Sequence, residues 1–246
     1  MKKIILSFTA MAMLTGASLN GEAQTLKNIL NTLQGSNNSQ SGSLTNSQVV
    51  SGLKEALRIG ANNAANKLSE TDGFFRNAAV KILMPPEVAQ VEKTLRSVGM
   101  GSIVDKAILS MNRAAEDAAK KAAPIFVDAI TSMTLEDGFS ILNGGQNAAT
   151  NFLRGKTSAA LSSAFRPVVQ QSLEKVGATA MWKTVFTTYN KLPLVAKKVN
   201  PDLSSYVVER ALDGMFYSIA QEELKIRTDP AAQVTNLLKQ VFGNKK

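Results

Sequence analysis

Apolar residues recur every three or four positions along most of the chain, and no segment shows the alternating pattern typical of a β-strand. The longest stretches of this kind are residues 45–68 and 102–133. The pattern therefore predicts an all-α fold, a single bundle of roughly eight to ten helices with no β-sheet. The other predicted helices cover residues 86–98, 134–143, 146–154, 157–176, 178–190, 202–227 and 230–243.

Capping and helix-breaking residues set several of these boundaries. Thr45 and Gln48 have the spacing of a capping box, in which each side chain bonds the backbone of the other residue at a helix start. Pro124 is expected to kink or break the helix over 102–133, because proline lacks the backbone N–H that the helix interior uses. Gly177 is expected to end the helix before it.

The start of the chain has a different pattern. The first three residues carry two lysines, residues 4–14 are mostly apolar, and Gly21 and Ala23 place small side chains at the −3 and −1 positions of a cleavage site. We therefore expect a secretory signal peptide over residues 1–23, cut before Gln24. The apolar run is too short for a stable membrane-spanning helix, so release into the periplasm is expected, with secretion as the second choice.

Three further segments follow the predicted signal peptide. Residues 24–45 should form a short helix and a flexible polar linker, because the linker part is rich in Gly, Ser and Asn. Residues 46–243 form the predicted helical domain, and residues 244–246 are a basic tail. The sequence has no second long apolar run, so no transmembrane segment is expected after signal removal.

The composition restricts the chemistry. The chain contains no cysteine and no histidine, which excludes disulfides, thiolate and imidazole nucleophiles, and the usual zinc sites. No loop repeats acidic residues with calcium-binding spacing. We therefore predict no metal site and no cofactor, and any catalysis would have to use carboxylates.

The formal net charge of +9 is spread along the chain in lysine pairs. Charge distributed in this way favours solubility and weak attraction to polyanions, and no nucleic-acid-binding motif is present. We therefore expect no nucleic-acid partner. The sequence leaves the oligomeric state open.

The densest polar cluster lies in the helix over 102–133, where Asn112, Arg113 and Glu116 occur together. Arg113 and Glu116 are three residues apart and can form an ion pair along the helix. One interpretation is a solvated helix face with weak ion pairs. The other is a central helix, covered on both sides, in which these side chains form a buried polar network or contact a ligand.

Further acidic candidates occur in the second half of the chain. Glu223 and Arg227 have the favourable i,i+4 order for an ion pair. The dipeptide Asp-Gly recurs at 72–73, 137–138 and 213–214, either as a remnant of an internal repeat or as a common turn and cap pair. The candidate polar-cluster or ligand-contact residues are Asn112, Arg113, Glu116, Asp137, Asp213, Glu222, Glu223 and Arg227.

Several motifs together resemble one known family. They include Met111-Asn-Arg-Ala-Ala-Glu116, Phe152-Leu-Arg154, Ala211-Leu-Asp-Gly214 and Ile219-Ala-Gln-Glu-Glu223. The chain resembles the bacterial domain of unknown function 4197 over about residues 46–243. This resemblance implies a single, exported, all-helical domain. It assigns no activity, so no catalytic residue is carried over.

Three functions remain open from the sequence. The leading hypothesis is a non-enzymatic envelope protein that binds a hydrophobic ligand, a lipid or a partner protein, since methionine and alanine suit adaptable apolar binding. The alternative is a carboxylate-dependent hydrolase of cell-wall or surface glycan, in which Glu116, Asp137, Glu222 or Glu223 would line an open cleft. The third is a scaffold whose polar clusters only fix the helix register.

Overall fold

The computed structural model describes residues 45–191, 198 and 202–228. Across these ranges the chain forms eight α-helices and one 3-10 helix, with no β-strand among them, so the predicted all-α fold is confirmed. The predicted signal peptide and the predicted helix over 230–243 lie outside the described residues. The helices are α2 (Asn46–Ser69), η1 (Pro86–Val88), α3 (Ala89–Ser97), α4 (Gly101–Ala119), α5 (Ala122–Thr131), α6 (Leu135–Asn143), α7 (Ala148–Glu174), α8 (Ala178–Tyr189) and α9 (Leu203–Thr228).

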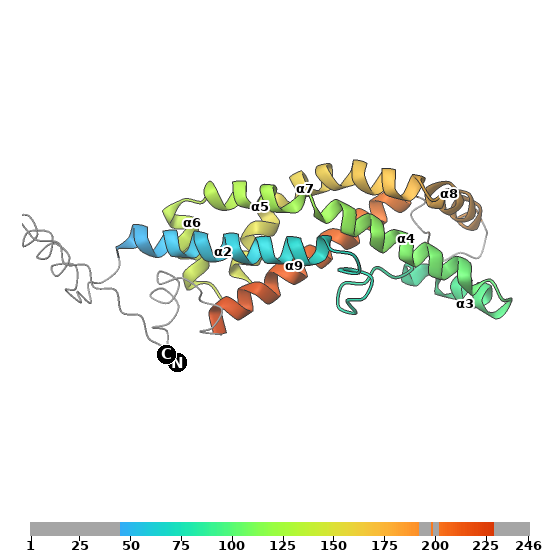
Figure 1. Ribbon diagram of the computed structural model, residues 1–246, viewed down its shortest axis with the longest axis horizontal. Coiled ribbons are helices and arrows are strands. Elements are labelled where there is room, and N and C mark those ends of the chain that lie inside the picture. Colours follow the sequence, from blue (N-terminus) through green and yellow to red (C-terminus); the bar gives the residue numbers. More distant parts are fainter. Residues whose placement is uncertain (1–44, 192–197, 199–201, 229–246) are drawn as a thin grey trace, which may run out of the picture. The chain divides into compact units, whose positions relative to one another are not determined.

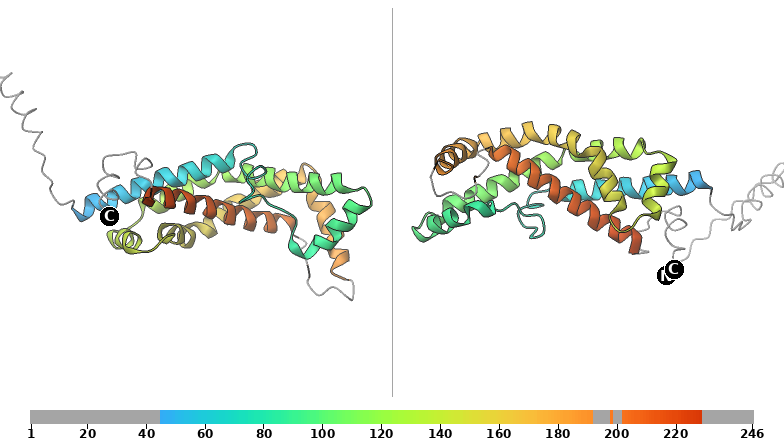
Figure 2. Two further views of the ribbon diagram at one scale, coloured as in Figure 1. Left: turned by 90° about the horizontal axis from the view of Figure 1, so that it is seen from below. Right: turned by 180° about the vertical axis from the view of Figure 1, so that it is seen from behind.

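The core lies between the long helices. α7 packs against α4, α5 and α9, and α2 packs against α5 and α9, so that α9 crosses the unit between α2 and α7 (Figures 1 and 2). Phe126 of α5 and Phe216 of α9 meet edge to face, with their ring centroids 6.0 Å apart. Buried alanines, among them Ala114 and Ala118 of α4, allow close approach of neighbouring helices. None of the described helices is both long and apolar enough to cross a membrane.

The capping box at the start of α2 is present as predicted. The Thr45 hydroxyl accepts a hydrogen bond from the Gln48 N–H at 3.2 Å, and the Gln48 side chain accepts one from the Thr45 N–H at 2.9 Å. Thr134 and Asp137 form a second capping box at the start of α6. These side chains satisfy backbone donors that a helix start leaves without intrahelical partners.

The break expected at Pro124 is present: the segment 102–133 forms two helices, α4 and α5, and Pro124 lies in the first turn of α5. A proline is tolerated there because first-turn N–H groups have no helical partner. The predicted separate helices over 146–154 and 157–176 are a single helix, α7, which continues through Gly155 and Pro167. Its buried face is continuous, so burial against α4 and α9 overrides the two helix-breaking residues.

The segment between α2 and η1 has turns instead of a helix, yet it contributes to the core. Phe74 and Ile82 are buried, and Phe74 packs against Gly214 of α9. A Cβ atom at Gly214 would lie 2.7 Å from the Phe74 ring, so only glycine permits this approach. The segment is therefore fitted closely between α4 and α9.

Helices α3 and α8 lie at one end of the described unit (Figure 1). α3 packs against α4, and α8 packs against α7 and α9. Gly177, with φ of +69°, separates α7 from α8, as the sequence predicts. This end of the unit contains the largely apolar pocket described below.

Candidate functional site

Glu116 of α4 is a buried carboxylate that holds the segment after α2. Its side chain is only 3% exposed. Oε1 accepts hydrogen bonds from the backbone N–H groups of Phe74 and Phe75, both at 3.1 Å. Oε2 accepts a hydrogen bond from Arg113 at 2.6 Å. Charge-assisted bonds of this kind are the stronger class, so the carboxylate fixes the path of this turn.

Arg113 and Asn112 extend the same cluster. Arg113 also donates to Asp72 at 2.6 Å, and the hydrogen bond to Glu116 and then that to Asp72 raise the pKa of its guanidinium. Asn112 is fully buried; its amide nitrogen donates to the Ile82 carbonyl at 2.8 Å, and its oxygen accepts from the Ile82 N–H at 2.9 Å. The sequence left open a solvated helix face or a buried polar network. Asn112 and Glu116 are buried and hydrogen-bonded, as the second interpretation requires, and Arg113 lies at the partly exposed edge of this cluster.

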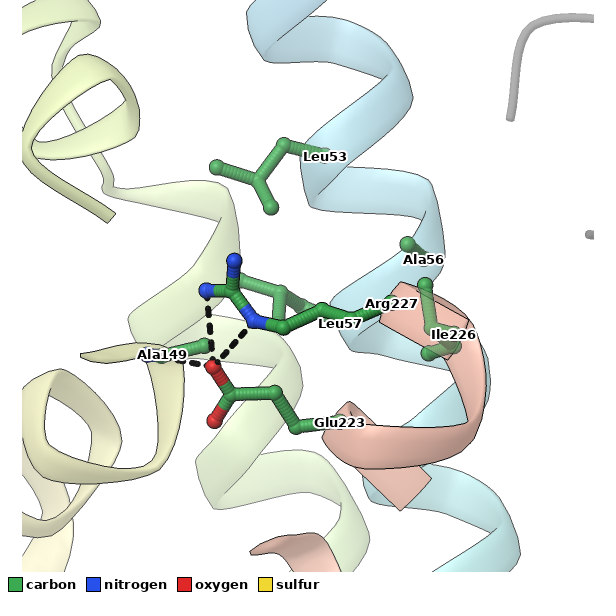
Figure 3. A pocket seen from close by; sticks show the side chains of 7 residues that line it. All are labelled: Leu53, Ala56, Leu57, Ala149, Glu223, Ile226 and Arg227. Atoms are coloured by element: carbon green, nitrogen blue, oxygen red, sulfur yellow. Dashed lines mark hydrogen bonds and ion pairs between the residues drawn. The ribbon is translucent and has the colours of Figure 1, made fainter. Parts of the chain in front are cut away.

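Glu223 of α9 forms a second buried cluster, shown in Figure 3. Its Oε1 accepts from the Ala149 N–H at 3.1 Å and from Arg227 at 2.9 Å. Its Oε2 accepts from the N–H of Thr150 at 2.9 Å and from the hydroxyl of Thr150 at 2.8 Å. Asn147 forms no side-chain cap at the start of α7, so Glu223 satisfies the first-turn donors from another helix.

Arg227 connects this second cluster to α6. Its guanidinium donates to the carbonyl of Ile141 at 3.1 Å as well as to Glu223. The hollow beside these residues, drawn in Figure 3, has a volume of about 10 Å³, room for about one water molecule. A second, mainly polar hollow of about 170 Å³ is lined by Gln146 and Gln221 and also by Glu223 and Arg227.

Each of the three remaining candidates forms a hydrogen bond or an ion pair outside the two buried clusters. Asp137 accepts the Thr134 N–H in the α6 capping box, and this bond lowers the pKa of its carboxyl. Asp213 pairs with Arg210 at 3.0 Å and with Arg154 at 3.4 Å. Glu222 pairs with Lys225 at 2.6 Å and accepts from Asn63 at 3.2 Å. The eight candidates thus form two buried clusters and three partly exposed groups of contacts, with no convergence on one catalytic centre.

A larger hollow, which we call the apolar pocket, lies among α3, α4 and α8. Its volume is about 350 Å³, and its wall is mostly aliphatic, aromatic or methionine side chain. Met181, which lines it, is 58% exposed, and Val176 is 59% exposed. Helical periodicity did not single these residues out, because the same pattern is typical of an ordinary core. The residues that line this pocket include Val91, Leu95, Ile103, Ala107, Met181 and Phe186.

No group of three or more acidic side chains that could hold a metal ion occurs in the part of the chain that the structure describes. The fold and the sites define an all-helical protein with two buried carboxylate clusters and a separate apolar pocket. The family model described as "Protein of unknown function (DUF4197)" matches residues 43–243, and the chain belongs to this family. Neither a curated protein nor a solved structure matches the chain.

Proposed function

We propose that the protein is an exported, non-enzymatic binding protein that takes a hydrophobic ligand in the apolar pocket. The observation that carries the proposal is the pocket itself. Its volume of about 350 Å³ lies in the range of about 300–1,000 Å³ that small-molecule sites occupy. Its wall offers the apolar surface and the adaptable methionine side chains that such sites use.

The exposed apolar side chains of the wall provide a driving force for ligand binding. Val176 and Met181 leave more than half of their surface in water. Covering apolar surface is favourable by about 25 cal/mol per Å². An apolar ligand that fills the pocket removes its own surface and that of these side chains from water at the same time. A partner protein could cover the same residues, so the test below uses a small molecule.

The distribution of carboxylates supports binding over glycan hydrolysis. Hydrolysis of a glycosidic bond uses two carboxyl groups on either side of the bond. Among the described residues that line the apolar pocket, one carboxylate occurs, Glu92, and it forms an ion pair with the Arg96 guanidinium at 2.9 Å. The carboxylate oxygens of Glu116 and Glu223 accept hydrogen bonds from backbone N–H groups and from arginines, and neither residue lines this pocket.

The test is binding of the neutral fluorescent probe N-phenyl-1-naphthylamine to the purified protein, with and without Ala107→Phe. Ala107 lies in the pocket wall, so the added ring should fill the site and reduce probe affinity at least about tenfold, the loss of roughly 1.4 kcal/mol. The matched control is Ala160→Phe, which adds the same ring on an exposed position of α7. Absence of probe binding, or equal loss in both variants, contradicts the proposal.

Export is a separate part of the proposal, supported by the signal-peptide pattern of residues 1–23. We expect the protein in the periplasmic fraction to have the intact mass of a chain that begins at Gln24. A full-length mass together with retention in the cytoplasmic fraction contradicts this part.

A further inference from the structure

We infer that the ligand of the apolar pocket is an amphiphile whose head carries both a positive and a negative charge. The tail occupies the apolar pocket, and the head occupies a second hollow, which we call the polar pocket. This inference rests on the function proposed above and names the class of ligand.

The polar pocket has a volume of about 440 Å³ and a mixed wall. Trp182 and Tyr206 supply aromatic surface, and their rings are stacked with centroids 6.3 Å apart and an angle of 15° between the planes. Pro85 and Pro86 supply rigid apolar surface on another side. The charged residues in the wall are Glu87, Lys198, Glu209 and Arg210.

The two pockets share walls. Trp182 lines both of them. Met84 lines the apolar pocket and the next residue, Pro85, lines the polar one. In the first turn of α9, Leu203 lines the apolar pocket and Tyr206 the polar pocket. A molecule that places one part in each hollow therefore passes the Trp182 side chain and stays in contact with the same three segments.

The charges in the polar pocket favour a head with both signs. Among the described residues, the wall includes two carboxylates, Glu87 and Glu209, and two cations, Lys198 and Arg210. Glu209 and Arg210 already pair at 2.6 Å, and Arg210 also meets Asp213 at 3.0 Å, whereas Glu87 forms no ion pair with a described residue. An ammonium group can contact Glu87 and the aromatic faces, and a phosphate or carboxylate can contact Lys198. A head that is only positive lies close to Lys198 and Arg210, and a head that is only negative lies close to Glu87 and Glu209.

The test compares dodecyl amphiphiles that differ only in the head, as competitors of N-phenyl-1-naphthylamine, each below its critical micelle concentration. The zwitterion is dodecylphosphocholine, and its matched partners are dodecyltrimethylammonium and tridecanoate, whose carboxylate also follows a twelve-carbon chain. We expect dodecylphosphocholine to displace the probe at about a tenfold lower concentration than either singly charged amphiphile. One additional charge-assisted contact lowers the dissociation constant about tenfold.

Two variants identify the residues. Glu87→Gln and Lys198→Met should each remove most of the preference for the zwitterion while leaving probe binding unchanged, since neither residue lines the apolar pocket. Glu174→Gln, on the exposed end of α7, is the control and should keep the preference.

The possible results distinguish a failure of the inference about the ligand head from a failure of the proposed apolar binding site. Equal displacement by all three heads, a preference for a singly charged head, or a preference that both variants leave intact overturns the inference about the head. In each of these cases probe binding and its loss in Ala107→Phe still support the apolar site. Failure of the probe to bind overturns the proposed function itself.

Discussion

Replacing Glu223 with glutamine should destabilise the protein much more than the same replacement at Glu116, although both carboxylates are buried. At Glu116 one oxygen, Oε1, accepts both backbone N–H groups. A glutamine oxygen can occupy that position, and only the bond from Arg113 is lost. At Glu223 backbone N–H groups face both oxygens, Ala149 at Oε1 and Thr150 at Oε2, so the amide nitrogen of glutamine must face one of them as a second donor.

The magnitudes follow from these bonds. Arg113 is 38% exposed, so solvent screens its ion pair and the loss in Glu116→Gln should be about 1 kcal/mol. In Glu223→Gln at least one donor is left without an acceptor. The Glu223 side chain is only 4% exposed, so water cannot readily replace that acceptor. A buried unsatisfied donor costs about 1–3 kcal/mol, and loss of one member of a buried ion pair about 3–5 kcal/mol. We expect about 3 kcal/mol for Glu223→Gln.

The assay is urea unfolding at pH 7, followed by far-ultraviolet circular dichroism and by the fluorescence of Trp182, with Glu174→Gln as the control. Glu174 is exposed, so its variant should stay within about 0.5 kcal/mol of the parent. Equal losses at Glu116 and Glu223, or a loss below about 1 kcal/mol at Glu223, would refute the assignment of these carboxylates as backbone acceptors.

Two further predictions concern stability. Gly138→Ala should cost about 1–3 kcal/mol, because the new Cβ would lie 2.7 Å from the buried Val50 side chain, whereas Gly155→Ala, in open space within α7, should gain about 0.5–1 kcal/mol. Urea midpoints of both variants measure this difference, and a loss in both would contradict it. Asp202 has a lowered carboxyl pKa: burial alone would raise it, but the hydrogen bonds from Ser205 and Arg166 together outweigh burial. Its contribution is present above the unfolded-state pKa of about 4 and lost as the pH falls through the lower folded-state pKa. Asp202→Asn should therefore be less stable than the parent at pH 6. In urea titrations at each pH, this difference should begin to shrink near pH 4 and disappear only below the lower folded-state pKa.

The helical fold could be predicted from local pattern, because the signals for it are local. The capping box at Thr45 and the glycine at 177 involve residues within a few positions of the helix ends. The prediction failed at α7, where two separate helices were expected on either side of Gly155. Packing of a continuous buried face against distant helices decided the outcome there, and no local pattern reports that packing.

The candidate polar residues illustrate the same limit. The spacing of Arg113 and Glu116 predicts that they can pair, and they do so at 2.6 Å. The partners that give Glu116 its role are the backbone N–H groups of Phe74 and Phe75, about 40 positions away along the chain. A backbone group has no sequence signature, so the choice between a solvated face and a buried network had to stay open. The apolar pocket was missed for a related reason, since its residues have core-like periodicity.

The buried cluster of α4 acts on the pocket through the segment that it holds. Asn112 fixes both the N–H and the carbonyl of Ile82, and the Tyr206 hydroxyl donates to the carbonyl of Leu83 at 2.8 Å. The next residues along the chain, Met84 and Pro85, form walls of the apolar and polar pockets. Because two consecutive residues, Ile82 and Leu83, are anchored just before these walls, Met84 cannot move far without breaking the buried hydrogen bonds of Ile82. Asn112, a member of the polar cluster predicted from the sequence, thus holds the segment that forms the pocket wall without lining the pocket itself.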